Sequence, residues 1–127
     1  MREADADAFI ETAIEAGSRT AEGGREIGAL DADQRLVYLI SEAEVLCDME
    51  GIPAFIDRYY PQWMEEAAAA FAEVGAAEIA TGLRAIAANV GNDPLLDRVN
   101  GLITSRAGYD YETIRKAVER RLAKRSA

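Results

Sequence analysis

The sequence contains no histidine, only one cysteine and no apolar run approaching the ~20 residues that a membrane span needs. Without histidine, the chain lacks the commonest general base and metal ligand, and serine triads of the usual kind are excluded. A single cysteine, Cys47, cannot form an internal disulfide. Carboxylates remain, but adjacent residues do not face each other on a helix and no calcium-loop spacing occurs. We therefore predict a non-enzymatic protein without catalytic residues, cofactor or metal.

The first residues, MREADADAF, are acidic where a signal peptide needs an apolar core. Together with the absence of a membrane span, this predicts a cytoplasmic protein that does not bind membranes.

The net charge of −9 is unevenly distributed. Residues 1–50 carry thirteen acidic and four basic side chains, whereas residues 91–127 carry five acidic and eight basic ones. An acidic chain is repelled by phosphate backbones, so we expect no direct binding to nucleic acid. The acidity favours a basic partner, or it serves solubility alone.

Apolar residues recur at helical spacing over most of the chain, beginning with a broad stripe over residues 36–47. A length of 127 residues fits one domain with its own core. We predict an all-α, single compact domain of six or seven helices around a central buried helix. Its parts are an acidic helix with a glycine-rich connector (1–30), a helical core (31–105) and a basic C-terminal helix (109–127). The predicted core residues are Leu36, Ile40, Ala43, Cys47, Phe55, Trp63, Phe71, Leu83 and Ile86.

Glycine and capping residues predict where the first helices begin and end. Gly17 is expected to close a first helix over residues 4–16, and a loop should follow as far as Leu30. Asp31 and Gln34 have the spacing of a capping box, which would open the central helix.

Later helix ends are predicted in the same way. Gly75 should separate two helices that form an antiparallel hairpin, with a close approach of their axes at Gly82. The second of these helices should carry an apolar stripe from Ile79 to Val90. The next helix should begin with Asp93 as N-cap and Pro94 in its first turn, and Asp110 should cap the last helix.

Four acidic residues recur every fourth position of the first predicted helix and form a ridge without a base. Like charges at this spacing destabilise a helix by ~0.2–0.5 kcal/mol per pair. The ridge is either a solvated helix face or a row of phosphate substitutes on a DNA-like surface. With two acidic residues further along, the candidate interaction surface is Glu3, Asp7, Glu11, Glu15, Glu22 and Glu26.

Glu44 falls inside the apolar arc of the central helix. An unpaired carboxylate is costly to bury, so Glu44 should either accept hydrogen bonds or lie at the rim of the core. We expect its partner to be the Tyr59–Tyr60 segment or an arginine, which makes Glu44 the candidate buried structural carboxylate.

In the middle half of the chain, a helix with a glutamate is followed by a glycine turn, an aromatic-rich short helix and a helix that ends in Gly-Ala. The residues of this pattern are Glu44, Gly51, Phe55, Ile56, Tyr59, Tyr60, Gly75 and Ala76. The pattern resembles that of the small bacterial DNA-mimic-like domain family. The family's Asn-Gly-Gly turn and following aromatic are replaced here by Met49–Gly51 and Ile52. The resemblance implies an all-helical fold, dimerisation and an acidic surface that imitates duplex DNA.

Two functions are compatible with the sequence. The first is an acidic non-catalytic interaction protein, such as a DNA mimic, that occupies the surface of a basic DNA-binding protein or toxin. The alternative is a self-associating helical scaffold, a homodimer for example, or an immunity or antitoxin-type protein whose acidity serves solubility. Clustered, parallel acidic residues at the spacing of phosphates would favour the first. Scattered acidic residues neutralised by the bases of residues 115–125 would favour the second.

Overall fold

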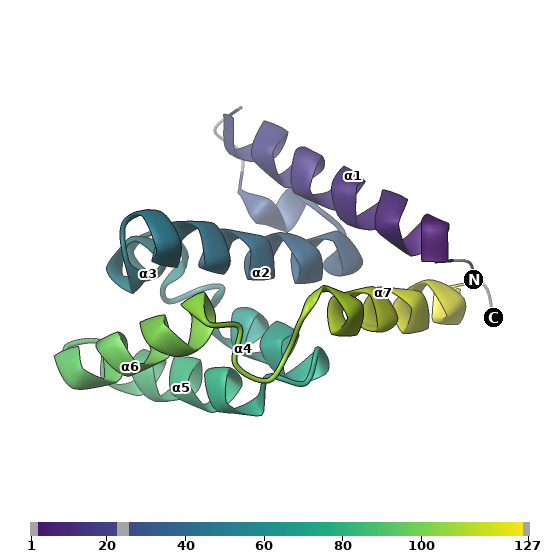
Figure 1. The fold of residues 1–127 in the computed structure, drawn as a ribbon. Helices are drawn as coiled ribbons and strands as arrows, with labels where there is room; N and C mark the ends of the chain where they lie inside the picture. The colour runs from purple at the N-terminus through teal and green to yellow at the C-terminus, as the bar shows by residue number, and fades with distance from the viewer. Residues whose placement is uncertain (1–2, 23–25, 126–127) are drawn as a thin grey trace. The chain divides into compact units, whose positions relative to one another are not determined.

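The computed structural model of the chain describes residues 3–22 and 26–125, with the backbone alone at residues 3 and 4 (Figure 1). Within these ranges there are seven α-helices, one short 3-10 helix and no strand, so the all-α prediction is confirmed. The elements are α1 (Glu3–Glu22), η1 (Ile27–Ala29), α2 (Ala32–Met49), α3 (Ile52–Tyr59), α4 (Met64–Glu73), α5 (Ala77–Ala88), α6 (Asp93–Thr104) and α7 (Tyr111–Arg125).

The chain divides into two compact units. The first unit is Met1–Tyr38 with Asp110–Ala127, and the second is Leu39–Tyr109. The first turns of α2 therefore belong to the first unit, and the remainder of α2 belongs to the second. The single domain predicted over residues 1–127, with its core at 31–105, stays a prediction.

In the first unit, α1 packs against α7 and η1, and it is longer than predicted. The expectation that Gly17 ends the helix was wrong, because α1 continues through Gly17 to Glu22. Gly17 is buried against the ring of Tyr38 at the start of α2. A glycine inside a helix can serve close packing as well as termination, and here it serves packing. Of the predicted loop, residues 23–25 lie outside the described residues.

Both predicted caps of the first unit are confirmed. The backbone N–H of Gln34 donates to Asp31 Oδ1 at 2.9 Å, and the Asp31 N–H donates back to Gln34 Oε1 at 3.4 Å. At the start of α7, the N–H of Thr113 donates to Asp110 Oδ1 at 2.9 Å. These bonds satisfy N–H groups that have no partner within their own helix.

In the second unit, α4 and α5 form the predicted hairpin, and α6 packs against both α5 and α3. Gly75, at φ +98°, provides the left-handed residue that ends α4. Gly82 makes its close approach to a different helix from the one predicted. A Cβ at Gly82 would lie 2.5 Å from Cγ2 of Val99 on α6. The glycine therefore allows α6, and not α4, to pack closely against α5.

Three details of the second unit differ from prediction. The N-cap of α6 is Asn92, one residue before the predicted Asp93, and its side chain accepts from the N–H of Leu95 at 3.2 Å. Val90 is 40% exposed because α5 ends at Ala88, before the predicted stripe does. Trp63 is half-buried, since it precedes α4 and is its N-cap. The other eight predicted core residues are buried, Leu36 in the first unit and the rest in the second.

Candidate interaction surface

The predicted acidic ridge of α1 is partly engaged within its own unit. The hydroxyl of Tyr111, on α7, donates to Asp7 Oδ1 at 2.7 Å, and this bond raises the pKa of Tyr111 above its ordinary value. Glu15 faces Arg19 at 4.0 Å, but both side chains are more than two-thirds exposed, so solvent screens the pair. Glu11 is exposed and forms no ion pair with another described residue.

Two other members of the predicted surface lie beyond this ridge. Glu22 and Glu26 are exposed, at the end of α1 and just before η1. The side chain of Glu3 lies outside the described residues. Glu11, Glu22 and Glu26 are therefore exposed carboxylates that are separated along the chain. Asp7 is instead hydrogen-bonded to Tyr111 on α7.

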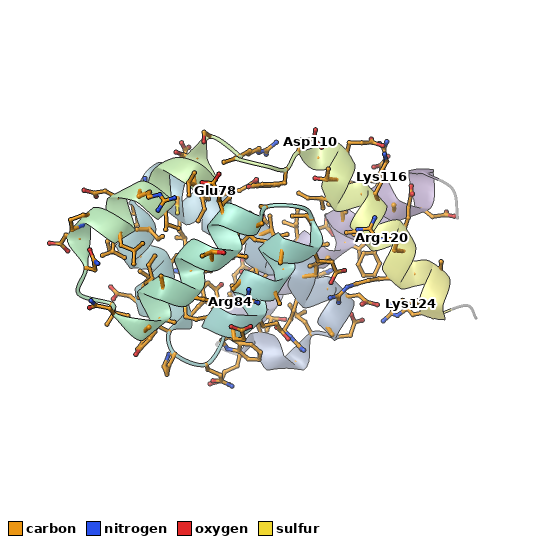
Figure 2. All side chains as sticks on the ribbon, turned by 90° about the horizontal axis from the view of Figure 1, so that it is seen from below. Glu78, Arg84, Asp110, Lys116, Arg120 and Lys124 are labelled. Carbon is orange, nitrogen blue, oxygen red and sulfur yellow. The ribbon has the colours of Figure 1, made fainter. Side chains whose placement is uncertain are left out.

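The basic helix α7 neutralises acidic residues at the start of α2 in the same unit. Arg121 pairs with Asp33 at 3.0 Å, and Arg125 pairs with Asp31 at 3.0 Å and with Asp33 at 2.9 Å. Burial acts to raise the pKa of Asp31. Hydrogen bonds from the Gln34 backbone and Arg125 outweigh this effect and hold the pKa below its ordinary value. Three further bases lie along one side of α7 (Figure 2), at successive i+4 positions: Lys116, Arg120 and Lys124.

The balance of charge therefore differs between the units. The first unit carries twelve acidic and ten basic side chains, a net charge of −2, so its α7 offsets most of its acidity. The second unit carries eleven acidic and four basic side chains, a net charge of −7. The charge of the protein is thus concentrated in the second unit and not in the first unit, where the ridge lies.

All four basic residues of the second unit are already paired with glutamates. The pairs are Arg58–Glu42 at 3.0 Å, Arg84–Glu65 at 2.9 Å, Arg98–Glu78 at 3.6 Å and Arg106–Glu44 at 3.0 Å. Figure 2 labels two of these side chains, Glu78 and Arg84, on α5. No arginine of this unit is left over to neutralise its other carboxylates.

Glu44 accepts two hydrogen-bond donors from the end of the second unit. The hydroxyl of Tyr109 donates to Oε2 at 2.6 Å, and Nε of Arg106 lies 3.0 Å from the same oxygen. Burial of Tyr109 and its bond to Glu44 raise the pKa of the tyrosine above its ordinary value. The predicted arginine partner is present, but the tyrosine is Tyr109, not Tyr59 or Tyr60. With 23% of its side chain exposed, Glu44 lies at the rim of the core.

The predicted tyrosine Tyr59 instead donates to Glu42 at 2.6 Å, beside the ion pair of Glu42 with Arg58. Glu42 was not singled out from the sequence, although it is the less exposed of the two glutamates, at 13% against 23% for Glu44. Residues two apart on a helix point in directions about 200° apart. Glu42 and Glu44 therefore each bind a different tyrosine and a different arginine. Both networks are structural, because they satisfy the buried hydroxyls.

Five exposed carboxylates of the second unit form no ion pair with another described residue, and we call them the seam carboxylates. They lie at the end of α2, on α3 and on α6, and α3 packs against α6. The backbone N–H of Ile52 ties the two helices together by donating to Asn100 Oδ1 at 2.9 Å. The seam carboxylates are Asp48, Glu50, Asp57, Asp93 and Asp97.

Two open hollows of about 340 Å³ each lie in the second unit, one lined by residues of α3 and α6 with Val90, and the other lined by residues of α2 and of the end of α6. We call the hollow that lies along α3 the α3 hollow. It is lined by Pro53, Ile56, Asp57, Tyr60, Val90 and Leu96. The second hollow, the α2 hollow, is lined by Glu44, Val45, Asp48, Met49, Ile103, Thr104 and Arg106.

Metal-binding and thiol chemistry have few candidate residues in the part of the chain that the structure describes. No three potential metal ligands of the described residues come together in a group that could hold an ion. Cys47 is buried on α2, and burial raises the pKa of its thiol to about 12. None of the described helices combines the length and the apolar character that crossing a bilayer requires.

Comparisons with known proteins add no assignment. No family model matches the chain, and no curated protein or solved structure matches it. The resemblance to the DNA-mimic-like family stays a prediction.

Proposed function

We propose that this chain is an acidic, non-catalytic cytoplasmic protein whose second unit binds a basic partner protein. One observation carries the proposal. The four arginines of the second unit form ion pairs with glutamates of the same unit. The seam carboxylates therefore stay exposed without an ion pair, and the unit has a net charge of −7. Unpaired surface charges of one sign steer oppositely charged proteins and accelerate their association.

A surface of this kind suits a DNA-binding protein or a basic toxin. In the DNA-mimic form of the proposal, the carboxylates take the place of phosphates, and the partner cannot hold duplex DNA and this protein together. The α1 ridge is less suited to that role. Asp7 is hydrogen-bonded to Tyr111, and the bases of α7 compensate the acidity of the same unit.

The test begins with the immobilised full chain, exposed to lysate of the source cell at low salt and eluted with a salt gradient. Each recovered basic protein is purified, and its Kd is measured against salt concentration with duplex DNA as competitor. Exposed charges are screened over ~8–10 Å near physiological ionic strength, so the affinity should fall steeply as salt rises. Competition by duplex DNA supports the mimic form. Binding that DNA leaves unchanged supports a basic partner recognised elsewhere, and affinity independent of salt contradicts the proposal.

A second function, self-association, is favoured by the α2 hollow. Val45 and Met49 stand four residues apart on α2 and are 46% and 75% exposed. An apolar pair of this kind could be covered by a second copy. Repulsion between units of −7 works against that arrangement, so we place it second. Sedimentation of the wild type and of Met49→Lys decides it, since only a dimer through this hollow dissociates on the substitution.

A further inference from the structure

We infer that the α3 hollow is the docking site for an apolar side chain of the partner, flanked in the partner's sequence by lysine or arginine. This inference rests on the proposed function and identifies the place and chemistry of the contact. Exposed carboxylates alone would bind any basic surface. An apolar hollow in the same unit adds specificity, because it binds only a partner segment that carries an apolar side chain beside its bases.

The hollow presents apolar surface that the fold leaves uncovered. Tyr60 is 42% exposed and Val90 is 40% exposed, and both line the hollow with the half-buried Ile56 and Leu96. The volume of about 340 Å³ is near the lower limit of ligand pockets, which run from ~300 to ~1,000 Å³. The space therefore suits one or two apolar side chains better than an extended small molecule.

The one charged residue in the lining of the hollow is acidic. Asp57 is the only ionisable carboxylate or base in its lining, and no lysine or arginine lines it. The nearest base in sequence, Arg58, is held by Glu42 at 3.0 Å, and that bond to Glu42 raises the pKa of the guanidinium. On α6, Asp93 and Asp97 lie on either side of Leu96 in sequence and carry no ion pair with described residues.

Two other hollows of this unit differ from the α3 hollow in charge. The α2 hollow contains the Glu44–Arg106 pair, and a third hollow of about 250 Å³, beside Gly82, contains the Glu78–Arg98 pair. The lining of each of these two hollows therefore includes an arginine. Charge complementarity therefore assigns the basic, apolar segment to the α3 hollow, where no lysine or arginine is among the lining residues.

The experiment selects short random peptides displayed on phage against the immobilised full chain at low salt. Enriched peptides are synthesised, and their Kd is measured by fluorescence anisotropy for the wild type, Tyr60→Ser, Val90→Ser and Asp57→Lys. Because all three side chains are exposed or half-exposed, the substitutions should leave the thermal midpoint nearly unchanged. Two control variants, Ile14→Ser and Glu22→Lys, make matched changes at exposed positions of the first unit.

The expected result is a consensus with an apolar residue flanked by lysine or arginine. Its binding should weaken about tenfold or more in the three hollow variants and less than about twofold in the two controls. Three outcomes overturn the inference: no enriched peptide, a consensus without bases, or binding that survives the hollow variants. Peptides that bind only a dimeric fraction of the protein also overturn it, because a second copy would then be the occupant.

The same variants separate this inference from the proposed function. If a basic partner protein binds with strong salt dependence but equally well to Tyr60→Ser and Val90→Ser, the proposed function stands and the docking site is wrong. If no basic protein binds and the peptide selection fails, both are wrong.

Discussion

The peptide backbone of Gly17 lies directly against the ring of Tyr38, so close that a Cβ on Gly17 would fall 2.1 Å from Cδ1 and 2.4 Å from Cγ of that ring. Tyr38 is 3% exposed, and its ring carbons next to the backbone have little freedom to move aside. The α1 helix therefore needs a residue without a side chain at this position, although glycine is a poor helix former.

Gly17→Ala should destabilise the protein, even though alanine improves helix propensity by up to ~1 kcal/mol. Overpacking a buried contact costs ~1–3 kcal/mol, and an overlap of this size belongs at the upper end. We expect a net loss of about 2 kcal/mol in the free energy of unfolding, measured by urea denaturation. Gly101→Ala is the control, because a Cβ at Gly101 on α6 meets nothing within 4 Å. That substitution should stabilise by up to ~1 kcal/mol, and equal effects of the two would refute the explanation.

This contact also marks the limit of what the sequence reveals. Local patterns predicted the buried stripes of α2, α4 and α5, the Asp31 and Asp110 caps and the break at Gly75, since these depend on neighbouring residues. A glycine, however, ends a helix in one context and packs a helix in another. Only the position of Tyr38, twenty-one residues away, distinguishes the two cases for Gly17.

The candidate site was predictable to a smaller extent for the same reason. The sequence indicated that Glu44 needs a partner, but Tyr109 lies 65 residues further along, and no local rule joins them. Likewise, the composition located the acidity in residues 1–50. Folding brings α7 against α1 and its bases onto Asp31 and Asp33, which leaves most of the net charge, −7 of −9, on residues 39–109.

Glu44→Leu should destabilise the protein more than Glu44→Gln, because leucine leaves the hydroxyl of Tyr109 without its acceptor. An unsatisfied buried group costs ~1–3 kcal/mol, whereas glutamine keeps an oxygen for the hydroxyl and loses only the charge. Adding Tyr109→Phe to Glu44→Leu should recover part of the loss, so the two single changes should be non-additive in urea denaturation. Tyr111→Phe, which removes the more exposed bond to Asp7, should cost less than ~0.5 kcal/mol. If the losses of unfolding free energy caused by Glu44→Leu and Tyr109→Phe were additive, the hydrogen bond between the two side chains would contribute nothing to stability.

Cys47 should react very slowly with a thiol reagent at about pH 8 while the protein is folded. Burial raises its pKa from 9.0 to about 12, which lowers the thiolate fraction about a thousandfold, and the side chain is only 4% exposed. Reaction should become fast and complete in urea. The measurement is the absorbance of the released chromophore over time, with and without denaturant. Rapid stoichiometric labelling of the folded protein would contradict the buried position.

Acid should weaken the contact between α7 and the start of α2. The pKa of Asp31 is lowered in the folded state, so its contribution to stability is present above the ordinary value of 3.8. That contribution disappears as the pH falls through the pKa of Asp31 in the folded protein, which lies below 3.8. Asp31→Asn keeps an oxygen for the Gln34 N–H but loses the charge that faces Arg125. The variant should be less stable than the wild type near neutral pH, with a difference that narrows in acid. Glu22→Gln, at an exposed position without a described ion pair, should show no such narrowing.

Two triple charge reversals should separate the surface of the second unit from the ridge of α1. The first set is Asp48→Lys, Glu50→Lys and Asp97→Lys, which are seam carboxylates outside the α3 hollow. The second is Glu11→Lys, Glu15→Lys and Glu22→Lys on α1, which spares Asp7 and its bond to Tyr111. Both sets change the net charge from −9 to −3, so any effect of total charge is the same in both.

Binding to a basic partner recovered by the salt-gradient capture should weaken about tenfold or more for the first set at low salt, and by less than about threefold for the second. The slope of log Kd against log salt should also flatten for the first set, because fewer charges are screened. Circular dichroism and the thermal midpoint confirm that both variants are folded, which is expected since all six side chains are exposed. If the α1 set weakens binding and the seam set does not, the ridge is the binding surface and the assignment to the second unit is wrong. If neither set changes the affinity, the acidity of this protein serves solubility, and self-association through the α2 hollow becomes the better account.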